Sequence, residues 1–263
     1  MRILVTGSSG QIGKELIELL EAHEVTCIDK KDGNNLNNIE VCKRIEKFAS
    51  EVVFHLAGSF DRLIEPPGFD SVNIEDNIMA THNLLQCVAP KQFIFASSYL
   101  VYKPQAPVLY EGMSVEPRNV IGAAKLWAEK MIEWKLSKAS VAHARIFRVY
   151  SKESNCFINH FANVKRLGGK VNVWNTDGTF DFIHAKDVAS ALISLFDSNV
   201  SGVFNVGTGT GHSVQDVVDM VGVETVRAND VFRSEHSIAS IGKIRGMTGW
   251  EPKVMLEDGI KEL

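Results

Sequence analysis

A glycine-rich turn between a strand and a helix constrains this chain more than any other feature. Residues 6–13 read Thr-Gly-Ser-Ser-Gly-Gln-Ile-Gly and directly follow the apolar run 3–5. Gly7 permits a tight turn, Gly10 lets the backbone approach a pyrophosphate, and Gly13 allows the helix to pack closely on the strand. The helix N-terminus points N–H groups and a partial positive charge at the phosphates. The pattern predicts a dinucleotide site, and a glycine turn without a ligand is the alternative.

Apolar strand patterns alternate with amphipathic helical patterns over the first 150 residues, which predicts βαβ units and a parallel sheet. Strands are expected at 2–6, 24–28, 52–56, 92–96 and 141–147, and helices at 11–22, 39–49, 72–89 and 119–137. Six residues separate Asp29 from Leu36, too few for a helix plus a strand. We therefore expect a doubly wound parallel α/β sheet of the Rossmann type with a contracted second crossover.

The pattern is less regular after about residue 150. Further elements are expected as helices at 156–167, 187–197 and 213–221 and as strands at 171–174 and 203–206. No internal repeat, low-complexity tract or Pro/Gly linker divides the sequence. We predict a dinucleotide-binding domain over 1–150 and a smaller substrate-binding part over 151–263, some segments of which return to the first core.

The composition excludes several classes of function. The net charge of −4 gives no electrostatic reason to expect nucleic acid or an anionic membrane as a partner. No apolar run reaches the length of a membrane span, and the first strand leaves no room for a signal peptide. The four cysteines are scattered without metal-ligand spacing, so we expect buried reduced thiols, no metal site and a cytosolic location.

An acidic residue at the end of the second strand completes the dinucleotide pattern. Asp29 can accept hydrogen bonds from the ribose hydroxyls of adenosine and repel a 2′-phosphate, which favours NAD over NADP. Lys30 and Lys31 weaken that preference, because either side chain could reach a phosphate.

The spacing Gly-x-x-Gly-x-x-Gly resembles that of the extended short-chain dehydrogenase/reductase family, the NAD-dependent epimerase/dehydratase group that acts mostly on nucleotide sugars. The resemblance runs nearly end to end and includes a closing Gly-Trp-x-Pro motif at 249–252. It implies an NAD-binding enzyme whose substrate is a sugar or a nucleotide sugar. Relatives often dimerise through the helices that match 72–89 and 119–137, so the resemblance also implies a homodimer.

The resemblance assigns further cofactor contacts. Asn35 and Leu36 match the acid–Leu pair that binds adenine, and Asn35 can accept a hydrogen bond from the adenine amino group. Residues 55–58 match His-x-Ala-Ala, in which His55 is expected to be structural. Asn77 matches the start of Asn-x-x-Gly-Thr, behind the active site. The complete predicted cofactor set is Gly7, Ser9, Gly10, Gln11, Ile12, Gly13, Asp29, Lys30, Asn35, Leu36, Leu56, Ala57, Gly58, Asn77, Ala96 and Lys125.

The catalytic segment is matched except at one position. Residues 97–103 are similar to the family's Ser-Ser-x-x-Val-Tyr-Gly, which makes Ser98 the hydroxyl that bonds the reacting substrate oxygen. Lys125 matches the lysine of Tyr-x-x-x-Lys, which binds the nicotinamide ribose and lowers the tyrosine pKa from about 10. Residues 126–129 continue the family pattern and fix the register. Ile121 therefore stands at the tyrosine position, and isoleucine cannot transfer a proton.

Three hypotheses follow from this gap. In the first, Tyr99 supplies the acid/base group, because family dehydratases carry an acidic residue one position after the catalytic Ser/Thr; an ordinary aromatic residue at a strand end is the alternative. In the second, Ser98 and a bound water sustain a reaction that needs less base assistance. In the third, the protein is a catalytically silent NAD-binding regulator or assembly partner.

The substrate half matches the family in part. Arg148 stands where many members contact substrate, although a surface salt bridge is an equal alternative. Phe180 replaces an arginine that often binds a nucleotide phosphate, while the polar residues after it are expected to be structural. Arg233 falls close to another phosphate-contact position. This half is also short, so a smaller substrate such as a free uronate is an option.

Overall fold

Six parallel strands form the central sheet of the computed structural model, which describes residues 1–59, 74–103, 106–173, 178–227 and 235–263. The strands are β1 (Arg2–Thr6), β2 (Glu24–Ile28), β3 (Val52–His55), β4 (Gln92–Ser98), β6 (Ser140–Ile146) and β11 (Gly202–Val206). Their order is β11-β6-β4-β3-β1-β2, with every neighbouring pair parallel. The predicted doubly wound α/β sheet is confirmed.

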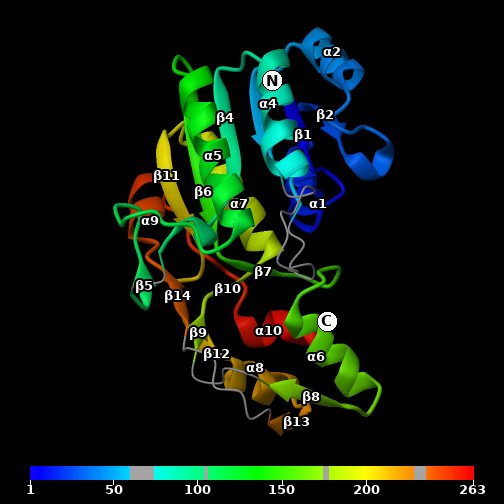
Figure 1. Cartoon of the computed structure of the whole chain (residues 1–263), viewed down its shortest axis with the longest axis vertical. Helices are drawn as coiled ribbons and strands as arrows, with labels where there is room; N and C mark the ends of the chain where they lie inside the picture. Colours follow the sequence, from blue (N-terminus) through cyan, green and yellow to red (C-terminus); the bar gives the residue numbers. More distant parts are fainter. Residues whose placement is uncertain (60–73, 104–105, 174–177, 228–234) are drawn as a thin grey trace.

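Helices cover both faces of this sheet (Figure 1). On one face α1 (Gln11–Glu18) packs against α7 (Ala185–Asp197), and on the other α2 (Ile39–Phe48), α4 (Ala80–Cys87) and α5 (Val120–Lys135) lie side by side. A π-helical turn, η2 (Glu75–Met79), leads into α4. Such turns are frequent at functional sites.

The strand order reverses between β1 and β3. The chain runs outward from β1 to β2, and α2 then returns it to β3 on the other side of β1. Residues 29–38 are all described, and they hold the short 3₁₀ helix η1 (Lys30–Asp32) and no strand, so the second crossover is contracted as predicted. In open α/β sheets ligands bind at the carboxyl ends of the strands beside such a reversal.

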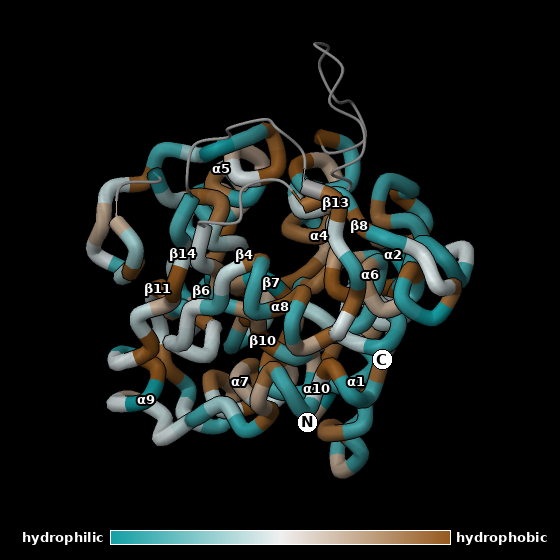
Figure 2. Tube along the Cα trace, turned by 90° about the horizontal axis from the view of Figure 1, so that it is seen from below, coloured by the Kyte–Doolittle hydropathy of each residue, from teal (hydrophilic) through white to brown (hydrophobic). Residues whose placement is uncertain are grey.

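Each central strand buries both of its faces. Ile3 and Val5 of β1 belong to the core cluster shared with α1 and α7, whereas Leu4 belongs to the cluster shared with α2 and α4. Apolar stretches of the trace accordingly run through the middle of the molecule, and polar stretches are more frequent at its periphery (Figure 2). This explains why the strands read as continuous apolar runs in the sequence.

The second half of the chain contributes to two places. Its α7 and β11 join the large sheet, while a lower cluster with its own core contains α6 (Phe157–Arg166), β8 (Lys170–Val173), α8 (Val214–Val221), β13 (Glu224–Arg227) and α10 (Leu256–Lys261) (Figure 1). Short strands connect the two: β5 (Val108–Leu109), β7 (Arg148–Tyr150), β9 (Thr179–Phe180), β10 (Phe182–His184), β12 (His212–Ser213) and β14 (His236–Ala239). The helix α9 (Gly242–Thr248) lies beside β11.

A buried carboxylate joins these short segments. Asp181 accepts hydrogen bonds from the N–H and hydroxyl of Thr208 at 2.8 and 2.7 Å, from the N–H of Gly209 at 2.9 Å and from the N–H of Ala239 at 3.1 Å. Asp187 accepts from two backbone N–H groups at 253 and 254 in the same way. The carboxylates of Asp181 and Asp187 are therefore used in hydrogen bonds that hold the fold together.

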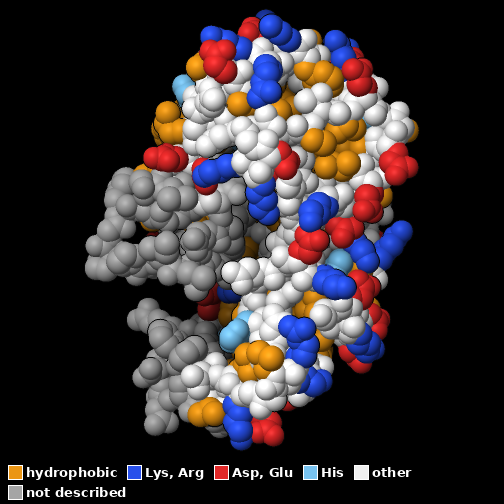
Figure 3. All heavy atoms as spheres, turned by 90° about the vertical axis from the view of Figure 1, so that its right-hand side faces the viewer, with side chains coloured by type: hydrophobic (Ala, Val, Ile, Leu, Met, Phe, Trp, Pro, Cys, Tyr) orange, Lys and Arg blue, Asp and Glu red, His pale blue; other side chains and the backbone are white. Residues whose placement is uncertain are grey.

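The prediction that all four cysteines are buried is wrong. All are free thiols, but only Cys42 is buried; Cys27 is exposed because it lies on β2, the edge strand of the sheet. Within the described part of the chain, no helix has both the length and the apolar character that crossing a membrane requires. Acidic and basic side chains are interspersed on the face seen in Figure 3.

Candidate functional site

The three glycines of the turn after β1 face different surroundings. Gly7 has φ +73°, and a Cβ there would lie 2.7 Å from the N atom of Ala57. A Cβ on Gly13 would overlap the carbonyl oxygen of Gly7, so this glycine packs against the turn itself rather than against the strand. A Cβ on Gly10 would meet only the Gly7 carbonyl oxygen, at 3.2 Å. The open side of the turn is therefore at Gly10.

The N-terminus of α1 has no side-chain cap within the described residues. Its N-cap residue is Gly10, whose carbonyl accepts the N–H of Lys14 at 3.0 Å. The N–H groups of the first turn have no carbonyl of their own helix to bind. Together with the open side of Gly10, they form a cradle that fits a pyrophosphate.

Asp29 lies beside this cradle and connects it to the next segment. Its Oδ2 accepts the N–H of Ser9 at 2.9 Å, and its Oδ1 accepts the N–H of Lys31 at 2.8 Å. Each carboxylate oxygen keeps a further acceptor position for a ribose hydroxyl. Lys30 forms a 3.2 Å ion pair with Asp76 of η2.

The predicted adenine contact is partly engaged by the protein itself. The Oδ1 of Asn35 accepts the N–H of Asn37 at 2.9 Å, which leaves one lone pair of that oxygen for a ligand. Leu36 is buried, and its carbonyl accepts the side chain of Asn83 from α4 at 3.1 Å.

The other predicted cofactor residues lie along the same edge of the sheet. The N–H of Ala57 donates to the hydroxyl of Thr6 at 3.2 Å, which places the β3 loop against the glycine turn. Leu56 and Ile12 are partly buried and pack on the core, Ala96 is buried in β4, and Gln11 accepts the hydroxyl of Ser151 at 3.0 Å.

His55 is part of the scaffold. Its Nδ1 lies 2.7 Å from the hydroxyl of Thr6, and its Nε2 lies 2.8 Å from the hydroxyl of Thr81 on α4. Burial, with a smaller contribution from the positive charge of Lys125, lowers the pKa of His55 to about 3. The neutral ring therefore connects β1, β3 and α4 and holds no mobile proton at neutral pH.

Lys125 is a buried amine at the carboxyl ends of the strands. A Cβ on Gly58 would lie 2.9 Å from its Nζ and would also overlap the Oδ1 of Asn77, so Gly58 leaves room for both side chains. Asn77 donates from Nδ2 to the carbonyl of Ser59 at 3.1 Å. Burial lowers the pKa of Lys125 to about 8, and the ammonium lies 5.0 Å from the centroid of the Phe95 ring. A buried amine with a shifted pKa is typical of a functional site.

The predicted catalytic residues Ser98 and Tyr99 are the last residue of β4 and the residue directly after it. The Oγ of Ser98 accepts the N–H of Leu100 at 3.2 Å and caps the 3₁₀ helix η3 (Tyr99–Val101). Tyr99 is 1% exposed, and its ring stacks on Phe147 with centroids 5.2 Å apart. Its buried hydroxyl has no hydrogen-bond partner among the described residues. Ile121 is buried in the same core cluster.

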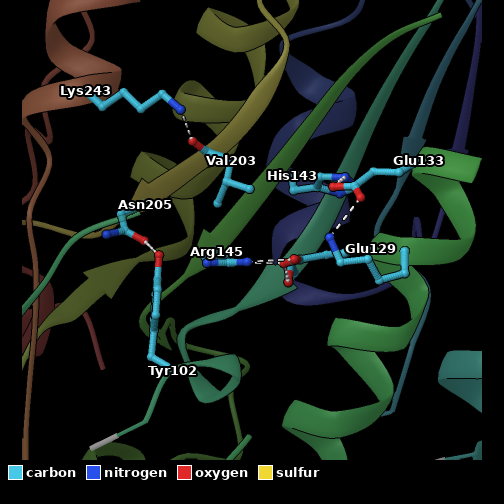
Figure 4. Close-up of polar contacts among 10 residues, drawn as sticks. Tyr102, Glu129, Glu133, His143, Arg145, Val203, Asn205 and Lys243 are labelled. Atoms are coloured by element: carbon cyan, nitrogen blue, oxygen red, sulfur yellow. Dashed lines mark hydrogen bonds and ion pairs between the residues drawn. The ribbon is translucent and has the colours of Figure 1, made fainter. Parts of the chain in front are cut away.

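A buried ion pair ties α5, which carries Lys125, to β6, and a hydrogen bond to the same glutamate ties α5 to β4, which carries Ser98. Glu129 accepts two hydrogen bonds from Arg145 at 3.0 and 2.8 Å and one from the hydroxyl of Ser97 at 2.5 Å. Figure 4 shows Arg145 and Glu129 pointing toward each other between β6 and α5. Because Glu129 is one turn after Lys125, this pair sets the position of the lysine relative to the serine.

Tyr102 is a packing residue beside that pair. Its ring lies 4.7 Å from the guanidinium of Arg145, and its hydroxyl donates to Asn205 at 2.7 Å (Figure 4). Burial raises its pKa to about 12. It is therefore engaged within the fold and neutral at physiological pH.

The predicted substrate residues are only partly described, because Arg233 lies outside the described residues. The guanidinium of Arg148 lies 4.1 Å above the ring of Phe180, which is buried. Sequence patterns missed two charged residues beside them, Arg118 and Glu235. No local sequence pattern connects Arg118 with Glu235, because 117 residues of chain separate them.

Comparisons with known proteins agree with this geometry. Residues 3–207 match the sequence profile of the NAD dependent epimerase/dehydratase family. The chain is similar to the UDP-glucose 4-epimerase of Corynebacterium glutamicum, with 27% identity over 303 aligned positions that cover 96% of this chain and 91% of that enzyme. Since the alignment is longer than the 263 residues here, the relative has insertions that this chain lacks.

Two solved structures share the whole fold. One is the UDP-glucuronic acid 4-epimerase of Bacillus cereus in complex with UDP-glucuronic acid and NAD, with a TM-score of 0.88 and 22% identity. The superposition covers 100% of this chain and 97% of that enzyme's chain. RMD from Pseudomonas aeruginosa, complexed with NADPH, has a TM-score of 0.85 and 24% identity, with coverage of 99% and 96%.

Proposed function

Because this chain belongs to the NAD dependent epimerase/dehydratase family, we propose that it oxidises a hydroxyl of a sugar or nucleotide sugar transiently, as an epimerase, dehydratase or dehydrogenase. The predicted cofactor, NAD, is the one that the family uses. The observation that carries the proposal is the buried Lys125, positioned by Glu129 relative to Ser98 at the ligand-binding edge of the sheet.

The residues present fit a dinucleotide. The open side of Gly10 and the uncapped N-terminus of α1 suit a pyrophosphate, and the carboxylate of Asp29 suits an unphosphorylated ribose. We therefore favour NAD over NADP. When bound, NAD accepts a hydride from the sugar carbon that carries the reacting hydroxyl.

The chain's own residues have distinct tasks in this proposal. Ser98 donates a hydrogen bond to the reacting oxygen, and Lys125 binds the hydroxyls of the nicotinamide ribose. Ile121 offers no proton acceptor, so we assign the hydroxyl proton to the phenolate form of Tyr99, whose buried side-chain oxygen has no hydrogen-bond partner among the described residues. A water held by Ser98 is the alternative acceptor.

The rival function is binding without turnover. Ile121 is 3% exposed and packs in the core, so the position of the usual tyrosine is filled by an apolar side chain. A silent NAD-binding regulator on this fold would bind the cofactor and transfer no hydride to any sugar.

One set of variants separates these functions. Purified wild-type protein, Tyr99→Phe, Ile121→Tyr and Ser98→Ala are incubated with NAD and a panel of nucleotide sugars and uronates. Nicotinamide absorbance is followed in single turnover, and the sugar product is identified by NMR. Turnover by the wild type that is lost in both Tyr99→Phe and Ser98→Ala supports the enzyme with Tyr99 as its base.

Other results point elsewhere. Turnover that survives Tyr99→Phe and disappears in Ser98→Ala assigns the proton to water. Activity that occurs only in Ile121→Tyr, while the wild type binds NAD, identifies the native protein as a silent binder.

We also propose a homodimer formed through α4 and α5. Apolar side chains line the outer face of α5 at Val120, Trp127 and Trp134, which are 41, 48 and 67% exposed, and the two tryptophan rings make an edge contact at 5.7 Å. Exposed apolar stripes of this kind mark interaction surfaces. Sedimentation should show a dimer that Trp134→Lys converts to a monomer; an unchanged sedimentation coefficient would exclude this face.

The remaining expectations belong to the same proposal. Residues 151–263 supply most of the substrate-binding part. Arg148, which lies just before this part in the chain, also contacts the substrate. The four free thiols agree with the reducing cytosol as the protein's location.

A further inference from the structure

Two arginines converge on the ring of Tyr99 from distant parts of the chain. The guanidinium carbon of Arg118, which precedes α5, lies 5.4 Å from the ring centroid, and that of Arg148, on β7, lies 5.7 Å from it. The two cations therefore lie next to the residue that directly follows Ser98.

A single carboxylate oxygen bridges these arginines. The Oε1 of Glu235 accepts a hydrogen bond from Nη1 of Arg118 and lies 3.5 Å from Nη2 of Arg148. The side chains of Arg118 and Arg148 are 9 and 16% exposed, whereas that of Glu235 is 36% exposed. Two largely buried positive charges thus share one negative charge, which is itself close to solvent.

Both guanidinium groups keep an unused donor. Nη2 of Arg118 and Nε of Arg148 are buried, and neither has a hydrogen-bond partner among the described residues. A buried donor without a partner destabilises the protein, and more strongly when it is charged. An incoming group with several acceptor lone pairs and a negative charge would relieve that cost, and carboxylates and phosphates match the fork of an arginine.

We propose that Arg118 and Arg148 form a binding site for one oxyanion of the substrate, and that Glu235 occupies this site in the free protein. The proposal rests on the function proposed above, because it takes the ligand to be an anionic sugar compound. A carboxylate on the sugar and the diphosphate of a nucleotide offer the same chemistry. The position beside Tyr99, next to Ser98, favours an oxyanion close to the reacting sugar carbon.

Two variants test the site with opposite expected signs. Arg118→Met removes one cation, so anionic ligands should bind at least about tenfold more weakly to the NAD-loaded protein. Glu235→Gln removes the competing charge and keeps the side-chain shape, so the same ligands should bind several-fold more tightly. Arg245→Met, in an exposed pair with Glu251, is the matched control and should change nothing.

Five probes distinguish the source of the oxyanion by calorimetry: UDP-glucuronic acid, UDP-glucose, UDP, free glucuronate and pyrophosphate. If the sugar carboxylate is bound, Arg118→Met weakens UDP-glucuronic acid and glucuronate and spares the other three. If the diphosphate is bound, Arg118→Met weakens the three nucleotides and pyrophosphate and spares glucuronate. Either pattern, with tighter binding to Glu235→Gln, supports the site.

The proposal is overturned if Arg118→Met and Glu235→Gln bind every probe as the wild type does, or if the wild type binds none of them. Arg118 also donates from Nε to the carbonyl of Tyr102 at 3.1 Å, so its loss could disturb folding. Arg118→Lys, which keeps the charge, and Glu235→Gln remain informative in that event.

Measurements of turnover test the proposed function independently of the oxyanion site. Arg118-dependent binding of anions without any turnover leaves the oxyanion site standing and removes the enzyme. Turnover of both UDP-glucuronic acid and UDP-glucose that is insensitive to Arg118→Met leaves the enzyme standing and removes the oxyanion site.

Discussion

The two ends of the ligand-binding edge are built in different ways. The cofactor end is made of backbone: a turn whose glycines leave no room for side chains, and the uncapped start of α1. The proposed substrate end is made of side chains from positions 99, 118, 148 and 235, held by ion pairs and ring contacts. A backbone cradle persists while side chains change, so this fold can keep its cofactor and alter its chemistry.

The largest effect should come from the cofactor end. In Gly13→Ala the new Cβ overlaps two carbonyl oxygens of the turn, so we expect a loss of about 3 kcal/mol in unfolding free energy and no NAD binding. Gly10→Ala is the control: its Cβ would lie 3.2 Å from a single carbonyl oxygen, so its stability loss should be smaller than that of Gly13→Ala while NAD affinity falls. Urea denaturation and calorimetry measure both, and an unperturbed Gly13→Ala would contradict a backbone-built cradle.

Lys125 is a buried side chain whose positive charge destabilises the free protein. Its folded pKa of about 8 lies below the ordinary lysine pKa of 10.5, so the folded state binds fewer protons between these values and stability rises with pH across that window. Lys125→Met should therefore stabilise the free protein by about 2 kcal/mol below pH 8, with the gain shrinking toward pH 10.5.

Bound NAD should reverse the order of stability of the wild type and Lys125→Met. Added NAD should raise the melting temperature of the wild type more than that of Lys125→Met, because only the lysine can donate to the ribose hydroxyls. Equal stabilisation of the two proteins by NAD would show that Lys125 does not touch the cofactor.

At the substrate end, removing one hydroxyl should hardly change stability. The phenol of Tyr99 has no hydrogen-bond partner among the described residues, so Tyr99→Phe should alter the unfolding free energy by less than about 1 kcal/mol, in the stabilising direction if at all. Thermal unfolding measures it, and a larger loss would reveal a bond to this hydroxyl.

The smallest effect is expected at the surface. Lys30→Ala breaks an ion pair with Asp76 in which the lysine is 60% exposed, so its stability cost should stay below about 0.5 kcal/mol. The ratio of NAD to NADP affinity, measured by calorimetry, should also change little. A marked loss of NADP binding alone would show that Lys30 reaches the 2′-phosphate.

The same contrast explains what could be predicted from the sequence. Most strands of the large sheet were predictable because they are apolar runs buried on both faces, although the edge strand β2 is buried only at its last residue; the glycine turn was predictable because its spacing is local. The short strands β9, β12 and β14 were missed, because two to four residues carry no periodicity and their partners are distant in the chain.

Pairings across long stretches of chain were also beyond prediction. No local sequence pattern marks Arg118, because the groups that it contacts, Glu235 and the Tyr99 ring, lie elsewhere in the chain. The sequence predicted that Asn35 can accept a hydrogen bond from adenine, but it did not show that the Asn35 side-chain oxygen already accepts the N–H of Asn37 within a short local turn. The cysteine prediction failed because exposure depends on which strand lies at the sheet edge.

The ion pair of Glu129 with Arg145 has a consequence for how activity can be gained or lost here. It aligns α5 with β6 two turns beyond position 121, the hydroxyl of Ser97 adds a bond from β4, and neither contact uses the side chain at position 121. Alignment and proton transfer are thus separable properties of one helix, and each can be altered without the other. A single codon at 121 could switch the reaction on or off in a scaffold that stays in register throughout.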